Sequence, residues 1–135
     1  MAVLPHEGTY SIMYGPFGVP VAAGYRPGYL ARPDRSGRYP PVVIVPAIDG
    51  LSSFEKDLCR SFARHGIAAL AIDLYRERTG DPIDDYLLLS DRSAITDLDE
   101  VHEFLESDDV DWSHSGAMGL LGLDVGGRFA LALGA

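Results

Sequence analysis

The fold of this chain is decided by the stretch Gly122-Leu123-Asp124-Val125-Gly126-Gly127. An apolar run bounded by glycines, residues 116–121, precedes it and is typical of a strand buried on both faces of a parallel sheet. Residues 128–133 follow with helical spacing, so the chain must turn sharply from strand to helix at Asp124. Such a turn strains its apex and leaves no room for side chains two positions away, which favours glycine at 122 and 126. The stretch therefore predicts a nucleophile elbow, with Gly127 as its third glycine.

The apex residue of this elbow, Asp124, stands where a nucleophile is expected. The N–H of Val125 would point at the reacting centre from a helix N-terminus, where negative charge is favoured. A carboxylate in this position can attack a saturated carbon and form an alkyl ester that water later hydrolyses, whereas attack on a carbonyl would give a reactive anhydride. Aspartate also tolerates left-handed backbone, and its charge is stabilised by the free N–H groups at the start of a helix. A site that has lost its activity could therefore keep this residue. Both interpretations stay open at this point.

Composition and charge limit the class of protein. With 135 residues, of which 47% are hydrophobic, the chain is expected to form a single globular domain over residues 1–135. The net charge of −9 argues against nucleic acid or an anionic membrane as partner, because phosphate contacts need clustered lysine and arginine. We find neither a basic leader nor an apolar run of membrane-spanning length, so a cytoplasmic location is expected. The single cysteine, Cys59, excludes an internal disulfide.

Strands alternate with helices along the chain. Apolar and β-branched runs predict strands over 9–14, 29–32, 41–45 and 67–72. Helices are predicted over 53–66 and 90–107, while residues 15–28 and 76–86 are expected to be loops. Apolar stripes mark the two helices: Phe54, Leu58 and Phe62 in the first, with Cys59 on its flank, and Ile95, Leu98, Val101 and Leu105 in the second. This alternation predicts an α/β fold with three layers, αβα, around a mostly parallel sheet.

These residues resemble the dienelactone hydrolase branch of the α/β-hydrolases. The resemblance rests on Gly28-Tyr29-Leu30-Ala31-Arg32-Pro33, on Val42-Val43-Ile44-Val45 leading into Ile48-Asp49-Gly50-Leu51, on Ala71-Ile72-Asp73-Leu74-Tyr75, on Asp97-Leu98 and on the elbow, in the family's order. It implies an eight-stranded sheet and hydrolysis of small lactones and esters by a triad of Cys or Ser, Asp and His. It also implies that the backbone N–H groups of Ile48 and Val125 form an oxyanion hole.

The sequence departs from this family pattern in three ways. Asp124 replaces the cysteine nucleophile, and Ala47 replaces the glutamate expected after the strand over 41–45. The triad acid and histidine would lie beyond Ala135, so residues 1–135 are expected to form the amino-terminal half of the fold, without its proton-transfer groups. None of the four histidines (His6, His65, His102 and His114) is placed by the sequence as a replacement base.

Several other residues are candidates for the site. Asp49 and Asp73, near predicted strand ends, are candidates for lining a pocket, although each can instead hydrogen-bond turn amides. Tyr75 fits either a substrate wall or the core. The acidic residues of 97–111 are expected to form a solvated face, because helical geometry spreads them around a surface, and no metal site or cofactor is predicted.

The sequence thus predicts a hydrolase-like protein acting on a small ester, lactone or related substrate, with a site that another subunit completes. The alternatives are a catalytically idle half-domain that binds a small molecule or serves in assembly, and one half of a split hydrolase. A strand over 116–121 with one unpaired edge would invite another chain. We therefore expect a homodimer or higher oligomer, with this edge or the face around Phe129, Leu131 and Leu133 covered.

Overall fold

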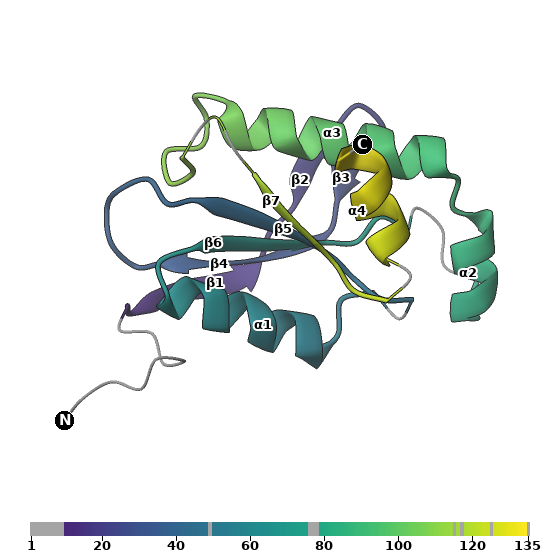
Figure 1. The fold of residues 1–135 in the computed structure, drawn as a ribbon, viewed down its shortest axis with the longest axis horizontal. Coiled ribbons are helices and arrows are strands. Elements are labelled where there is room, and N and C mark those ends of the chain that lie inside the picture. Colours follow the sequence, from purple (N-terminus) through teal and green to yellow (C-terminus); the bar gives the residue numbers. More distant parts are fainter. Residues whose placement is uncertain are drawn as a thin grey trace.

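The computed structural model describes residues 10–48, 50–75, 79–114, 116, 118–124 and 126–134. Among these residues, five strands form one mixed sheet in the order β1-β4-β6-β5-β7, and β2 and β3 form a separate hairpin (Figure 1). The strands are β1 (Ile12–Pro16), β2 (Val19–Val21), β3 (Gly24–Arg26), β4 (Gly28–Pro33), β5 (Pro41–Val45), β6 (Ala68–Ile72) and β7 (Gly119–Gly122). The helices are α1 (Ser53–Arg64), α2 (Pro82–Leu88), α3 (Asp91–Glu106) and α4 (Gly126–Gly134).

The centre of the sheet is parallel, as the sequence predicts. β5 pairs in parallel with β6 on one side and with β7 on the other. β4 and β1 are added antiparallel beyond β6. The register sets Val45 opposite Gly122, so the turn after β7 begins at the carboxyl end of β5.

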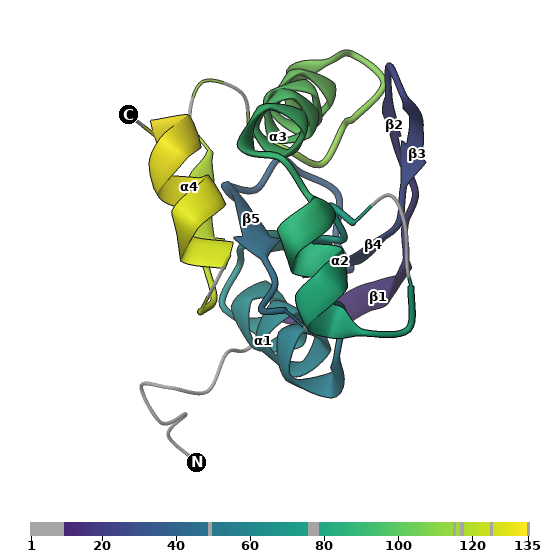
Figure 2. The same ribbon diagram turned by 90° about the vertical axis from the view of Figure 1, so that its right-hand side faces the viewer.

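Helices cover both faces of the sheet, which confirms the predicted three-layer α/β fold. α1 lies on one side of the strands, and α3 and α4 lie on the other (Figures 1 and 2). On the second side, the predicted stripe of α3 is buried at Leu98, Val101 and Leu105, in one cluster with Val43 and Leu70 of the sheet. The core is therefore built by apolar residues that recur at helical spacing against buried parallel strands.

The buried face of α1 differs from the predicted one. Phe54, expected in the apolar stripe, is exposed, and Leu58 and Phe62 are only partly buried. The residues in full contact with the sheet are small ones; Cys59 and Ala63 of α1 meet Ala31, Ala69 and Ala71. Small side chains on both surfaces permit the close packing of protein interiors, and the larger ones fill the flanks. Burial raises the pKa of the Cys59 thiol to about 12, so this cysteine is a packing residue and not a nucleophile.

Two segments predicted as loops contain regular structure. Residues 15–28 include the β2–β3 hairpin, whose Val19 is fully buried beneath α3. Residues 76–86 overlap α2, which starts where Asp81 accepts hydrogen bonds from the N–H groups of Ile83 and Asp84. Asp81 followed by Pro82 is a helix-start signal that the sequence interpretation missed.

The strand that leads to the elbow is an edge strand. β7 has β5 as a neighbour on one side and is the last strand in the order of the described sheet. Its residues are partly or fully exposed, so the prediction of a strand buried on both faces is wrong. That another chain pairs with this edge stays a prediction.

Candidate active site

The turn between β7 and α4 has the backbone of an elbow. Asp124 has a φ of 52°, the one left-handed non-glycine residue among those described. The N–H of Leu123 donates to the carbonyl of Val45 at 2.9 Å, which extends the β5–β7 ladder by one residue. The N–H groups of Gly126 and Gly127 then donate to the carbonyls of Leu123 and Asp124 at 2.9 and 3.0 Å. Left-handed backbone costs a non-glycine residue about 1–2 kcal/mol, and such conformations cluster at functional sites.

Two glycines of the elbow lie so close to other backbone atoms that a side chain would not fit. A Cβ on Gly122 would lie 2.4 Å from the Cα of Gly127, and a Cβ on Gly126 would lie 2.3 Å from the carbonyl oxygen of Val45. Both contacts are with backbone atoms, which cannot swing aside as a side chain can. Gly127 differs, because its Cβ would come no closer than 4.0 Å to the nearest atom outside its own helix. The space around the turn therefore explains Gly122 and Gly126 but not Gly127.

The side chain of Asp124 is exposed at the carboxyl end of the parallel strands. Ile48 lies in the turn after β5, which is closed by a 2.9 Å hydrogen bond from the N–H of Gly50 to the carbonyl of Ala47. The turn after β5 and the start of α4 touch, since a Cβ on Gly126 would also lie 2.6 Å from the carbonyl oxygen of Pro46. Val125 lies outside the described residues, so the oxyanion hole of Ile48 and Val125 stays a prediction.

The three residues predicted to line a pocket, Asp49, Asp73 and Tyr75, do not form one site in the described structure. Asp49 lies outside the described part of the chain. Asp73 accepts a 2.9 Å hydrogen bond from the N–H of Tyr75, the turn contact that the sequence left open as an alternative. Tyr75 is 8% exposed and belongs to the core cluster beneath α3. Its position therefore fits the core interpretation of this residue.

The described histidines lie away from the elbow. His114 donates its backbone N–H to the carbonyl of Tyr39, just before the start of β5 and hence at the opposite end of the sheet from Asp124. His65 follows the end of α1, and its Nδ1 lies 2.8 Å from the carbonyl of Ser61. The Nε2 of His102 lies 2.9 Å from the carboxylate of Glu106. None of these three rings is within reach to serve Asp124 as a base.

The acidic segment is not uniformly solvated. Asp97 is only 1% exposed, on the inner face of α3, which corrects the prediction of a solvated face at this position. Its neighbours Asp99 and Glu103 are exposed as expected. Asp85 of α2 is also buried and accepts hydrogen bonds from the N–H and hydroxyl of Thr79. The described residues contain no group of three side chains that could hold a metal ion.

A contact that the sequence did not reveal joins α2 to the elbow helix. Arg128, in the first turn of α4, donates a 2.9 Å hydrogen bond to the hydroxyl of Tyr86 and pairs with Asp91. The Tyr86 ring packs edge-on against Phe129, with ring centroids 6.3 Å apart. The hydrogen bond to Tyr86 raises the pKa of Arg128. These contacts join α2 to the start of α4, the helix that follows Asp124.

Comparison with known proteins settles the family. The sequence profile of the dienelactone hydrolase family matches residues 27–135. The chain belongs to the dienelactone hydrolase family. One relative, named "Probable 2-oxo-3-(5-oxofuran-2-ylidene)propanoate lactonase" from Bradyrhizobium sp, is 33% identical over 113 residues, which cover 78% of this chain and 45% of that protein. Another, named "Putative carboxymethylenebutenolidase" from Yersinia pestis, is 38% identical over 77 residues, covering 56% of this chain and 28% of that protein.

Solved structures of dienelactone hydrolases share the fold. A crystal structure titled as a putative dienelactone hydrolase from Klebsiella pneumoniae matches with a TM-score of 0.79 at 28% identity, covering 91% of this chain and 54% of the other. This dienelactone hydrolase-like chain thus spans about half the length, or less, of the relatives it matches. Among the residues described, none of the helices combines the length and apolar character that crossing a bilayer demands.

Proposed function

We propose that this protein hydrolyses a small ester, lactone or related substrate, with Asp124 as the nucleophile. The observation that carries the proposal is the left-handed backbone of Asp124, held between two glycines that backbone contacts require. A strained apex with an exposed carboxylate is costly for a merely structural turn. Family membership supports the reaction class. We further propose a cytoplasmic location, which the single free cysteine supports.

The proposed reaction has two steps. The Asp124 carboxylate attacks the saturated carbon of the substrate's C–O bond; that bond breaks, and the electron pair leaves with the substrate's carboxylate. The alkyl group is then held as an ester of Asp124. Water attacks the Asp124 carbonyl carbon, a base takes the proton, and the alcohol leaves with a proton as the Asp124 carboxylate returns. Attack at the saturated carbon avoids the anhydride that attack on the carbonyl would form.

The second step needs N–H donors near the Asp124 carbonyl oxygen. Water attack on the Asp124 ester generates an oxyanion, which backbone N–H groups at a helix start stabilise. We propose that the N–H groups of Ile48 and Val125 fill this role. The base is proposed to come from outside the described residues, because their histidines lie elsewhere.

Oxygen-18 labelling distinguishes this mechanism from direct carbonyl hydrolysis. A single turnover of a small lactone by excess protein in oxygen-18 water is expected to place the label in the side chain of Asp124, because water attacks that residue. Peptide mass spectrometry locates the label. Label found only in the carboxylate of the product would contradict the role of Asp124. The Asp124→Asn variant, which fits the same turn, is the matched control and is expected to take up no label.

A second candidate function is an idle half-domain that binds a small molecule. The distance of the described histidines from the elbow favours it. It predicts saturable ligand binding without turnover, and no label in Asp124 under the conditions above.

We also propose that a second copy of the chain covers the open side of the β7–α4 unit. The edge of β7 and the side chain of Leu131, which is 78% exposed, support this proposal. Light scattering after size-exclusion chromatography is expected to give a dimer at micromolar concentration, and Leu131→Glu is expected to shift it toward monomer. Tyr25→Glu, which alters an exposed aromatic residue of the separate hairpin, is the control. A stable wild-type monomer would refute the proposal.

A further inference from the structure

A pocket lies at the opposite edge of the sheet from the elbow. It has a volume of about 250 Å³ and is lined by Met13, Tyr14, Gly15, Pro16, Phe17, Leu30, Arg32 and Trp112. β1, which supplies four of these eight residues, is four strands away from β7, or roughly 19 Å at the usual strand spacing. This pocket is thus separate from the proposed site at Asp124.

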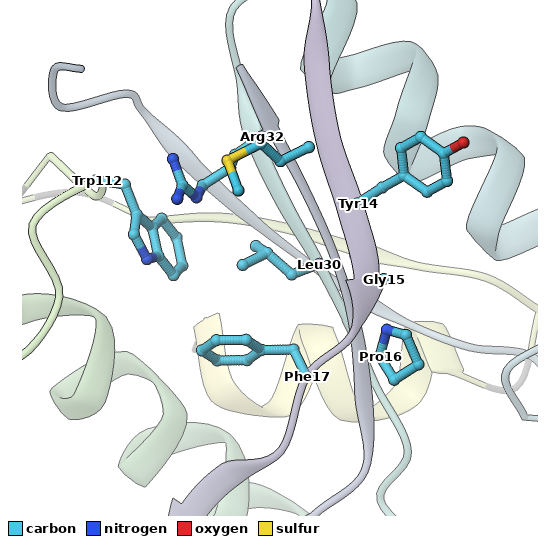
Figure 3. Close-up of a pocket in the computed structure, with 8 residues that line it drawn as sticks. Tyr14, Gly15, Pro16, Phe17, Leu30, Arg32 and Trp112 are labelled. Carbon is cyan, nitrogen blue, oxygen red and sulfur yellow. The ribbon is translucent and has the colours of Figure 1, made fainter. Parts of the chain in front are cut away.

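The hollow exists because of a glycine in the edge strand. Gly15 stands opposite Leu30 in the β1–β4 register, and a Cβ built on it would meet nothing within 4 Å. Since residues alternate between faces, Arg32 lies on the same face of β4 as Leu30. Figure 3 shows Phe17, Leu30, Arg32 and Trp112 gathered on one side of β1, while Tyr14 points to the other. The pocket therefore has an apolar floor and one cationic side chain.

The aromatic residues give the pocket flat walls. The Phe17 ring packs edge-on against Trp112, with ring centroids 6.1 Å apart, and lies tilted against Phe104, with ring centroids 6.0 Å apart. The Arg32 guanidinium carbon lies 6.0 Å from the centre of the Trp112 ring. Aromatic walls of this kind bind a planar ring by offset or edge-on contact.

Arg32 has no ion-pair partner in the part of the chain that the structure describes, where its guanidinium contacts only the Trp112 ring. Its side chain also lines an adjoining polar hollow with Asp34 and Asp111, both described, but no ion pair joins it to either carboxylate. A guanidinium offers paired N–H donors in a plane, which matches a carboxylate. A partly buried arginine beside apolar walls is therefore suited to a carboxylate that carries an apolar group.

We propose that this pocket binds a small aromatic carboxylate, with its ring against the exposed sides of Phe17 and Trp112 and its carboxylate on Arg32. The volume limits the ligand to about one ring, because pockets for drug-sized ligands begin at about 300 Å³. The two nearby aspartates weaken the attraction for an anion, so a dissociation constant on the order of 1 mM is expected for the simplest ligand.

Benzoate is the probe for this proposal, and Trp112, the only tryptophan of the chain, is the reporter. Titration with benzoate is expected to change Trp112 fluorescence saturably, with benzamide and acetate each binding at least about ten-fold more weakly. No saturable change with benzoate would overturn the proposal. If benzamide bound as tightly as benzoate, the carboxylate would have no role in binding. If acetate bound as tightly as benzoate, the aromatic ring would have none. Either result would refute the proposal.

Variants locate the site. Arg32→Gln is expected to weaken benzoate binding about ten-fold or more, whereas Arg35→Gln, which removes an exposed arginine of the adjoining hollow, is expected to leave it unchanged. Gly15→Val fills the hollow with a residue that favours strands, so it is expected to abolish binding while preserving the fold by circular dichroism. Unchanged binding in both Arg32→Gln and Gly15→Val would refute the assignment.

Discussion

Gly126→Ala is expected to lower the free energy of unfolding by about 3 kcal/mol or more, because forced overpacking typically costs 1–3 kcal/mol and here the clash is with fixed backbone. The new Cβ would lie 2.3 Å from the carbonyl oxygen of Val45 and 2.6 Å from that of Pro46. Relief requires that α4 move away from the end of β5, which breaks the elbow. Since whole domains are stable by about 5–15 kcal/mol, the variant is expected to be largely unfolded at moderate urea concentrations.

Gly127→Ala is the matched control for this prediction. The two glycines are adjacent in the first turn of α4, but a Cβ at position 127 would lie 4.0 Å from the carbonyl oxygen of Gly122, an ordinary contact distance. Alanine also favours a helix over glycine by about 1 kcal/mol, so Gly127→Ala is expected to be neutral or slightly stabilising. Urea unfolding followed by circular dichroism measures both variants. Equal losses at the two positions would show that helix packing at the elbow does not depend on the contact with Val45.

Phe129→Ala is expected to cost about 3–5 kcal/mol, the usual loss for a buried phenylalanine. Phe129 is 2% exposed, lies in the core cluster with α3 and packs edge-on against Tyr86 of α2. Its removal leaves a cavity where three helices meet. This position also corrects the expectation that Phe129 belongs to a face covered by a partner, because its own chain already buries it. The side chain of Leu133, the third member of that predicted face, lies outside the described part of the chain.

Leu131→Ala on the same helix is the comparison for Phe129→Ala. Leu131 is 78% exposed, so its truncation is expected to change the free energy of unfolding of the monomer by about 0.5 kcal/mol or less. Measurement at low protein concentration keeps self-association out of the result. A small effect at Phe129 would mean that α4 is not packed on the core as the structure places it.

The sequence predicted the elbow well because its determinants are local. The spacing of Gly122 and Gly126 around Asp124 follows from steric limits within a few residues. The catalytic role of Asp124 stays a prediction, since it depends on a base that local sequence does not place. The parallel strands at the centre of the sheet were predicted for a similar reason. A continuous run of apolar, β-branched residues indicates a buried strand whichever strands it pairs with.

The errors arose where distant partners decide the structure. The buried face of α1 was misassigned because the alanines of the sheet accept small residues such as Cys59 and Ala63, which no stripe of large apolar residues reveals. The burial of Asp97 on the inner face of α3 was not predicted, because it depends on tertiary packing. The pocket beside Gly15 was missed because it depends on the register of β1 against β4. Only the start of α2, at Asp81 and Pro82, was readable from local sequence and overlooked.

The strand order has a consequence for how the chain acquires its elbow during synthesis. β5, α1 and β6 are consecutive in the chain and can pair as soon as they have been translated, whereas β7 must find β5 across the long intervening segment that holds α2 and α3. Contacts between residues far apart in sequence form slowly, because the connecting loop must close first. We therefore expect the turn that carries Asp124 to form late, after β5 and β6 have paired. We also expect it to be the part of the structure that is missing when folding is interrupted.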